Sequence, residues 1–287
     1  MPPDLPSLSD SDALSLAIKA AVDAALAEDV GQGDVTSNAV IPKNAHFKGT
    51  LRAREDMVVA GMEAARVAFL TLDKNCTWTA NLNDGDAIKN GTVIASVEGN
   101  ARALLASERT ALNILQHLSG IATTARRFVD AIEGTTAQMK DTRKTIPGLR
   151  LLAKYAVRMG GAVNHRMGLD DAVLIKDNHI AIAGDVKMAV AAAKKTGLPV
   201  QVECDTLDQV SQSLDAGADS LLLDNMKPDM LRRAVDIVAG QVETEASGGV
   251  KLDTVRAIAE TGVTFISSGF ITQSSPATDI GLDWETL

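Results

Sequence analysis

The sequence predicts an α/β fold, in which an incomplete α/β barrel of about seven strands follows an N-terminal α+β sandwich domain. From about residue 137 onward, short aliphatic runs alternate with helical patterns, and Glu203, Asp224 and Glu245 follow one another at intervals of 21 residues. One strand, one turn and one helix fit that length. Aromatic residues make up only 3% of the chain, so aliphatic side chains must build the core, as they do in parallel sheets.

The expected barrel strands are apolar runs that end in polar or charged residues, and glycines mark the ends of the helices between them. The region spans about 130 residues, whereas a closed eight-stranded barrel usually takes about 250. We therefore expect a reduced barrel. Its candidate strands are residues 138–141, 162–166, 172–176, 200–203, 221–224, 242–245 and 265–268.

The N-terminal part predicts a mixed domain over residues 1–115, with the barrel over residues 116–270. A helical pattern at residues 12–28 is followed by β-like segments at 47–53, 57–60 and 91–97 and by a helix at 63–72. A long helix comes next, with Ser107 as its expected N-cap and Gly134 at its end. We expect the C-terminal tail, residues 271–287, to pack back on the first domain.

Composition excludes several classes of function. A net charge of −9 argues against nucleic-acid binding, which usually needs a basic face. No apolar run approaches the roughly 20 residues of a membrane span, and the N-terminus lacks the features of a signal peptide. Cys76 and Cys204 are too few and too distant for a disulfide framework or a zinc site, and Cys204 is expected to be a buried thiol. A cytoplasmic location and no membrane partner are therefore expected.

Positive charge is concentrated in one region of this acidic chain. Between residues 140 and 180 there are eight Lys and Arg against four Asp, a local charge of +4. Such a region predicts that the site attracts a small polyanionic ligand. Arg150, Lys154 and Arg158, however, recur every four residues on one helix and are expected on a solvated face.

Other cationic residues lie where the early barrel strands end, which is where barrel active sites form. Burying Lys or Arg there without a partner would be costly, so a ligand-binding role is favoured. His165 alone would more often be a structural histidine, but the adjacent Arg166 favours a functional one. The cations at these ends are Arg143, Lys144, Arg166 and Lys176.

Carboxylates and glycines follow the later strands. Glu203, Asp224 and Glu245 could bind a divalent cation such as Mg²⁺ together with substrate phosphates, or pair with the nearby cations, or do both. Glycine-rich turns after the last two strands predict a phosphate site. These turns contain Ser247, Gly248, Gly249, Ser268 and Gly269. The residues alone thus predict an enzyme that acts on a phosphorylated, multiply anionic small molecule, without naming that molecule.

At these same residues the chain resembles the quinolinate phosphoribosyltransferase family, the carboxylating nicotinate-nucleotide pyrophosphorylases. The matching segments run in family order from residue 28 to residue 269. Asp141-Thr-Arg-Lys-Thr145 and Glu245-Ala-Ser-Gly-Gly249 are two of them. The others are residues 28–36, 107–113, 117–123, 161–169, 174–179, 202–203 and 223–225. Phe270 and Gln273 depart from the family pattern, in which a small residue and a histidine are expected.

The resemblance implies an activity and a set of partners. The family transfers the phosphoribosyl group of phosphoribosyl pyrophosphate to quinolinate with decarboxylation in NAD biosynthesis, and Mg²⁺ is the implied cofactor. It also implies a homodimer in which Arg109 reaches the active site of the neighbouring subunit; assembly beyond a dimer is left open, as is any contact between Glu245 and the metal.

The resemblance also implies roles for the site residues, with Lys144, Lys176, Glu203 and Asp224 as the catalytic set. Arg143, His165, Arg166 and Lys176 correspond to positions that hold the two carboxylates of quinolinate and line the phosphoribosyl pocket. Lys144 corresponds to a position near the pyrophosphate. Glu203 and Asp224 correspond to positions for Mg²⁺ and the ribose hydroxyls. Ser247, Gly248, Gly249, Ser268 and Gly269 correspond to the substrate-binding loops around the 5′-phosphate.

Two alternatives remain at the level of the sequence. A related phosphoribosyltransferase of the same fold could use another acceptor, as in the protein found with molybdate transport systems, although the cationic set favours a dicarboxylate. A non-catalytic regulator that senses a nucleotide or phosphate belongs to a different class, and the presence of Glu203 and Asp224 argues against it.

Overall fold

A computed structural model describes residues 12–284, which divide into two compact units. One unit comprises residues 127–145 and 162–273, and the other comprises residues 12–126, 146–161 and 274–284. The expected division between residues 115 and 116 falls inside the helix α4 (Ala101–Ala131), whose backbone hydrogen bonds continue through that point. The helix α5 (Arg150–Met159) belongs to the same unit as residues 12–126 and 274–284.

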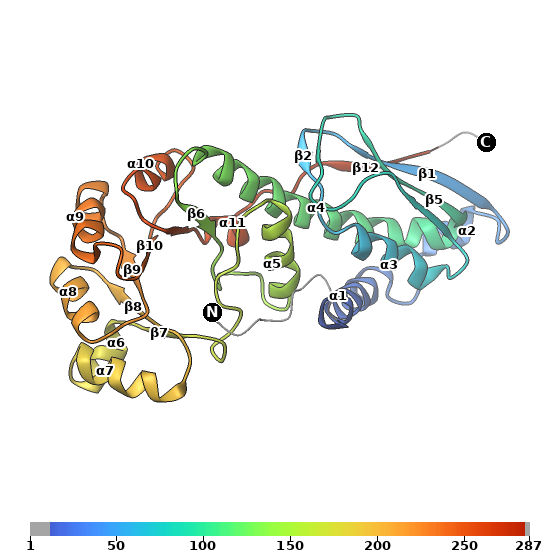
Figure 1. Cartoon of the computed structure of the whole chain (residues 1–287). Coiled ribbons are helices and arrows are strands. Elements are labelled where there is room, and N and C mark those ends of the chain that lie inside the picture. Colours follow the sequence, from blue (N-terminus) through green and yellow to red (C-terminus); the bar gives the residue numbers. More distant parts are fainter. Residues whose placement is uncertain (1–11, 285–287) are drawn as a thin grey trace. The chain divides into compact units, whose positions relative to one another are not determined.

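The unit of residues 127–145 and 162–273 is built on one parallel sheet with the strand order β6-β11-β10-β9-β8-β7 (Figure 1). The strands are β6 (Gln138–Lys140), β7 (Val173–Ile175), β8 (Val200–Cys204), β9 (Ser220–Asp224), β10 (Glu243–Ser247) and β11 (Phe265–Ser267). Its helices are α6 (Asp177–Ala183), α7 (Val186–Ala193), α8 (Leu207–Asp215), α9 (Pro228–Val238), α10 (Val255–Ala259) and α11 (Phe270–Gln273), with a short 3₁₀ helix at Lys194–Thr196. Helices α7 to α10 lie along the outside of the curved sheet.

The expected incomplete α/β barrel is confirmed, but one of its seven expected strands is reduced to a single contact. Residues 162–166 form only a parallel bridge between Val163 and Lys140. The Asp141 carboxylate accepts the His165 backbone N–H at 2.7 Å and the Asn164 side-chain N–H at 2.7 Å. The His165 backbone N–H thus bonds to a side chain and not to the neighbouring strand, so the segment leaves the sheet after one bridge.

Side chains on the barrel strands alternate between the helix layer and the barrel interior. In β8, Val200, Val202 and Cys204 are buried, whereas Gln201 and Glu203 are partly accessible from the interior. Cys204 is 0% exposed, so its expected role as a buried thiol is confirmed. The same alternation brings Asp224, Glu245 and Ser247 to the cavity side of β9 and β10.

The other unit contains an antiparallel sheet with the order β12-β1-β5-β3, together with a two-stranded pair, β2 and β4. Its strands are β1 (His46–Ala53), β2 (Met57–Val58), β3 (Thr77–Ala80), β4 (Ala87–Ile88), β5 (Val93–Asn100) and β12 (Ile280–Trp284). Its helices are α1 (Asp12–Val30), α2 (Val35–Val40), α3 (Met62–Leu72), α5 and most of α4. The C-terminal segment β12 is an edge strand that pairs Leu282 with Leu51 of β1.

Two sequence-based expectations for the helices are wrong. The helix α4 begins at Ala101, where Asn100 Oδ1 accepts the Ala103 backbone N–H at 3.2 Å, and not at Ser107. Ser107 lies within the helix, 0% exposed, and its hydroxyl donates to the Ala103 carbonyl at 2.9 Å. On α5, Lys154 is 0% exposed rather than solvated. A spacing of four residues places side chains on one helix face, but it does not reveal what covers that face.

Both cysteines are free and buried. Within the described range of the chain, none of the helices combines the length and apolar character that crossing a bilayer requires.

Candidate active site

A cavity of about 280 Å³ lies at the carboxyl ends of the barrel strands. Asp224 and Ser247 end β9 and β10 and are paired in register, and Glu203 lies near the end of β8. All the residues that line the cavity belong to the barrel unit. They are Thr142, Arg143, Lys144, His165, Arg166, Leu174, Lys176, Glu203, Leu222, Asp224, Glu245, Ser247 and Ser267. The structure thus brings together most of the residues that the sequence predicted to form a site.

One wall of the cavity carries two arginines that repel one another. Burial first, and then the positive charge of Arg143, lower the pKa of the Arg166 guanidinium. Arg166 is held in place because its Nη1 donates to the Ala172 carbonyl at 3.0 Å. Two cations held this close raise the local positive potential, and an anion between them would relieve the repulsion.

Carboxylates also line the cavity. Burial first, and then the charges of Glu203 and Asp205, raise the pKa of the Asp224 carboxyl. Glu203 accepts a hydrogen bond from the ammonium group of Lys176, with which it forms an ion pair. Asn225 donates from Nδ2 to Asp224 Oδ2 at 2.5 Å. Negative charge is therefore concentrated at the ends of β8 and β9, where a cation would be bound favourably.

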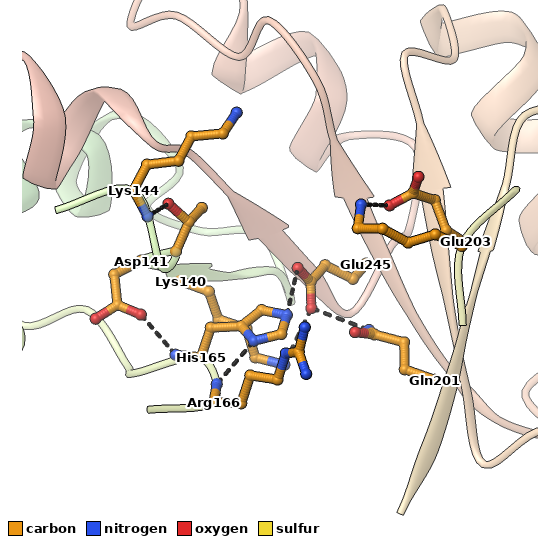
Figure 2. Close-up of polar contacts among 10 residues, drawn as sticks. Lys140, Asp141, Lys144, His165, Arg166, Gln201, Glu203 and Glu245 are labelled. Carbon is orange, nitrogen blue, oxygen red and sulfur yellow. Dashed lines mark hydrogen bonds and ion pairs between the residues drawn. The ribbon is translucent and has the colours of Figure 1, made fainter. Parts of the chain in front are cut away.

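The floor of the cavity is a buried polar cluster (Figure 2). Glu245 lies in the middle of β10 and not at a strand end as expected, because the strand runs on to Ser247. Its carboxylate is 1% exposed and lies 3.4 Å from Lys140 Nζ, 3.2 Å from Gln201 Nε2 and 3.3 Å from His165 Nε2. Burial by itself would raise the pKa of Glu245, but the proximity of His165 first, and then the charge of Lys140, lower it to about 2.

Sequence reasoning missed Lys140 and Gln201 as members of this site. The signal was present for Gln201, which precedes Glu203 by two residues and so shares its face of the strand. Lys140 ends β6, which pairs with β11, and its ammonium group is 3.3 Å from the centroid of the Phe265 ring on β11. That cation–π contact joins positions far apart in the chain and has no local sequence signature.

The glycine-rich turn after β10 is closely packed. Gly248 has φ +91°, and a Cβ atom added there would lie 2.2 Å from Asn225 Oδ1. Gly249 also has a positive φ of +61°, but nothing lies within 4 Å of its added Cβ. The Asn225 backbone N–H donates to the Ser247 carbonyl at 2.9 Å, which holds the two strand ends together. Only Gly fits at position 248 without displacing Asn225.

The turn after β11 divides its predicted residues differently. Ser268 is 3% exposed, and its hydroxyl donates to the Val250 carbonyl at 3.0 Å; Ser267 lines the cavity instead. Gly269 lies against Lys144, whose Cδ would be 2.8 Å from an added Cβ. Phe270 and Gln273, the two departures from the family pattern, bound the short helix α11 and do not line the cavity.

Arg109 is the one predicted site residue that lies in the other unit, exposed on α4. That unit has a second cavity of about 400 Å³, lined by Asp12, Glu63, Asp84 and mostly apolar side chains. No Lys, Arg or His is among the described residues that line it, so it does not suit an anionic ligand.

Comparison with known proteins identifies the family. Residues 34–119 match the model of the quinolinate phosphoribosyl transferase N-terminal domain, and residues 121–283 match the model of the C-terminal domain. The chain belongs to the quinolinate phosphoribosyltransferase family. This agrees with the resemblance found in the motifs.

Relatives of known name extend over most of the chain. The probable nicotinate-nucleotide pyrophosphorylase (carboxylating) of Bacillus subtilis is 40% identical over 259 residues, 89% of this chain and 89% of that protein. The chloroplastic enzyme of the same name in Oryza sativa subsp. japonica is 42% identical over 291 residues, 94% of this chain and 78% of that protein. The nicotinate-nucleotide pyrophosphorylase structure from Francisella tularensis is 40% identical, with a TM-score of 0.91, covering 94% of this chain and 96% of the other.

Substituting Gly248 by alanine should weaken binding of ribose 5-phosphate at least about tenfold more than the same change at Gly249, a difference of about 1.4 kcal/mol. Both variants place a side chain at positive φ, but only Gly248→Ala adds a clash with Asn225. Calorimetric titration of the two purified variants measures the difference. Equal affinities would show that the packing of this turn is unrelated to phosphate binding.

Proposed function

We propose that this chain transfers the phosphoribosyl group of phosphoribosyl pyrophosphate to quinolinate with decarboxylation, giving nicotinate mononucleotide, pyrophosphate and CO₂ in NAD biosynthesis. The observation that carries the proposal is one cavity that Arg143, Arg166, Glu203 and Asp224 line together. The names of the family relatives support the choice of substrates.

The cationic wall suits a dicarboxylate acceptor. Planar guanidinium groups can bind carboxylates through two parallel hydrogen bonds, which gives orientation as well as affinity. The mutual repulsion of Arg143 and Arg166 is relieved when an acceptor carboxylate lies between them. Lys176 also lines the cavity, where it pairs with Glu203. Its ammonium group adds a further positive charge for the acceptor carboxylates.

The carboxylate side suits a phosphorylated donor with Mg²⁺. Glu203 and Asp224 repel one another, and a divalent cation would relieve that repulsion. No set of three His, Cys, Asp or Glu side chains converges as a metal site within residues 12–284, so at most two protein carboxylates are offered. Mg²⁺ characteristically takes one or two carboxylates and completes its shell with phosphates and water. When bound, it would supply positive charge to the leaving pyrophosphate.

The chemistry requires positioning and electrostatics but no protein nucleophile. The pyridine nitrogen forms a bond to the ribose carbon as the bond to pyrophosphate breaks, and the ribose passes through an oxocarbenium-like state. Glu203 and Asp224 stabilise the positive charge on the ribose, while Lys144 neutralises charge on the leaving group. The ribosylated ring is cationic, so it stabilises the electron pair left on C2 when the bond to the 2-carboxylate breaks and CO₂ leaves. That C2 carbanion then takes up a proton from solvent to give nicotinate mononucleotide. The nearby Gly248 turn would bind the 5′-phosphate.

Assembly and location are also part of the proposal. We place the protein in a homodimer in which Arg109, exposed on α4, reaches the neighbouring subunit's site. A reducing cytoplasm suits two cysteines that are both free.

The activity is tested by incubating the protein with quinolinate and phosphoribosyl pyrophosphate, with and without Mg²⁺, and with nicotinate as the control acceptor. Pyrophosphate and CO₂ should be released in equal amounts with quinolinate, only when Mg²⁺ is present, and not with nicotinate. Pyrophosphate release only with another acceptor would favour a related transferase. Binding without any turnover would favour a regulator.

Arg143→Ala and Lys176→Ala should each lower kcat/KM for quinolinate at least about 100-fold, because each removes a charge-assisted contact to a carboxylate. Circular dichroism should be unchanged, since neither residue belongs to the apolar core. Lys187→Ala, exposed on α7 and outside the cavity, is the matched control. Turnover close to wild type in either site variant would count against the acceptor assignment.

Arg109→Ala and Lys176→Ala subunits should complement one another when they are mixed and allowed to reassociate. Half of the randomly formed dimers are hybrids with one intact site in two, so about a quarter of the wild-type activity should return. Differently tagged subunits allow the hybrids to be isolated before the assay. If isolated hybrids remain inactive, the site is not shared between subunits.

A further inference from the structure

The Glu245 side chain places a negative charge in a cavity that has to attract anions. It is 1% exposed and lines the same cavity as Arg143 and Arg166. A buried charge without a partner of opposite sign destabilises the fold. A negative one at this place would also repel an anionic ligand and draw on the cations that should bind it. The group that neutralises Glu245 therefore matters for ligand binding as well as for folding.

The two oxygens of Glu245 have different surroundings (Figure 2). Oε2 accepts hydrogen bonds from Lys140 Nζ at 3.4 Å and from Gln201 Nε2 at 3.2 Å. Oε1 accepts no hydrogen bond from the residues that the structure describes, and His165 Nε2 lies 3.3 Å from it. An imidazole carries charge only when it is protonated, whereas an ammonium group is charged at neutral pH. Lys140 is therefore the donor that brings a lasting positive charge to Glu245.

The strand register explains how Lys140 reaches Glu245. Its strand, β6, is separated from β10 by β11. Phe265 of β11 pairs with Glu245 on one side and with Gln138 on the other, so these three side chains share one face of the sheet. Lys140 follows Gln138 by two residues and lies on the same face. Its ammonium group lies 3.3 Å from the centroid of the Phe265 ring, in reach of the carboxylate on the next strand.

These contacts hold Lys140 beneath the cavity and not inside it. Its side chain is 17% exposed, and it is not among the described residues that line the cavity. The negative face of the Phe265 ring favours a cation at this place, and the Glu245 carboxylate gives it a direction. Lys140 is thus placed to compensate Glu245 without a contact to substrate.

We propose that Lys140 is a positioning residue for the acceptor site: it pairs with Glu245 beneath the cavity, so that the cations that line the cavity remain available to the acceptor carboxylates. This inference rests on the proposed function, because that function makes a dicarboxylate the ligand of those cations. Without Glu245, Lys140 would have no charge to balance. The effect of losing Lys140 should therefore depend on whether Glu245 is present.

The charge balance is tested with Lys140→Met, which keeps most of the side-chain volume and removes the charge. We expect the KM for quinolinate to rise at least about tenfold, because Glu245 is then uncompensated. The double variant Lys140→Met/Glu245→Gln has a neutral floor again, so its KM should return to within about threefold of wild type. Lys140→Arg keeps the charge and should also stay within about threefold. Loss of a purely structural side chain would not be repaired by a second substitution.

Two further variants separate charge from other effects. Lys194→Met is the matched control, because Lys194 also pairs with a carboxylate, that of Asp219, but the pair is exposed and lies outside the cavity. Its KM should equal that of wild type. Gln201→Leu removes the other hydrogen bond to Glu245 Oε2 but no charge, so it should raise the KM for quinolinate less than Lys140→Met does.

Urea unfolding of the wild type, the two single variants and the double variant tests the pair without any substrate. Removing one partner of a buried ion pair leaves a charge uncompensated, whereas removing both does not. The double variant should therefore unfold at a higher urea concentration than Lys140→Met, and the two losses of stability should not be additive. If wild type did not turn over quinolinate, the proposed function would fail, while this comparison would still test the ion pair.

The proposal is refuted by an unchanged KM in Lys140→Met, or by a double variant whose KM is no lower than that of Lys140→Met. A loss in Gln201→Leu or in Lys194→Met as large as that in Lys140→Met would also refute it, as would additive losses of stability.

Discussion

The inward-facing positions of the barrel strands carry charged side chains, and the burial of those charges constrains the rest of the site. Glu245 is almost completely enclosed, so Lys140, Gln201 and His165 must converge on it from three other segments. An unpartnered carboxylate at this depth would be severely destabilising. The side chains that approach Glu245 therefore tie together the segments that form the floor of the cavity.

At the carboxyl ends of the strands, around the cavity, the charges are only partly matched within the protein. The positive charge of Arg143 helps to lower the pKa of Arg166. The negative charge of Glu203 helps to raise the pKa of Asp224. Such like-charge pairs are unfavourable in the free protein and become favourable when a ligand of the opposite sign enters. A dicarboxylate on one side and a metal-bound polyphosphate on the other would satisfy both. At the floor, by contrast, the charge of Glu245 is matched within the protein by Lys140.

Much of this site could be predicted from the sequence, since parallel strands deliver their carboxyl-terminal residues to one edge. Most of the predicted cationic and acidic residues, with Ser247, do line one cavity. Ser268 does not, because its hydroxyl is used by the Val250 carbonyl, and Ser267 faces the cavity in its place. A difference of one residue in a strand reverses the direction of a side chain, and a sequence pattern rarely locates strand ends that closely.

The sequence by itself determined the α/β class, the reduced size of the barrel and the charges that its strand ends would carry, because periodicity and residue type are local properties. Only the tertiary structure decided that Glu245 lies inside its strand, that Lys140 crosses to the Phe265 ring, and that Lys154 is enclosed. It also reduced residues 162–166 to one bridge. Each of these depends on what a distant segment places beside the residue, and spacing along the chain carries no information about that neighbour.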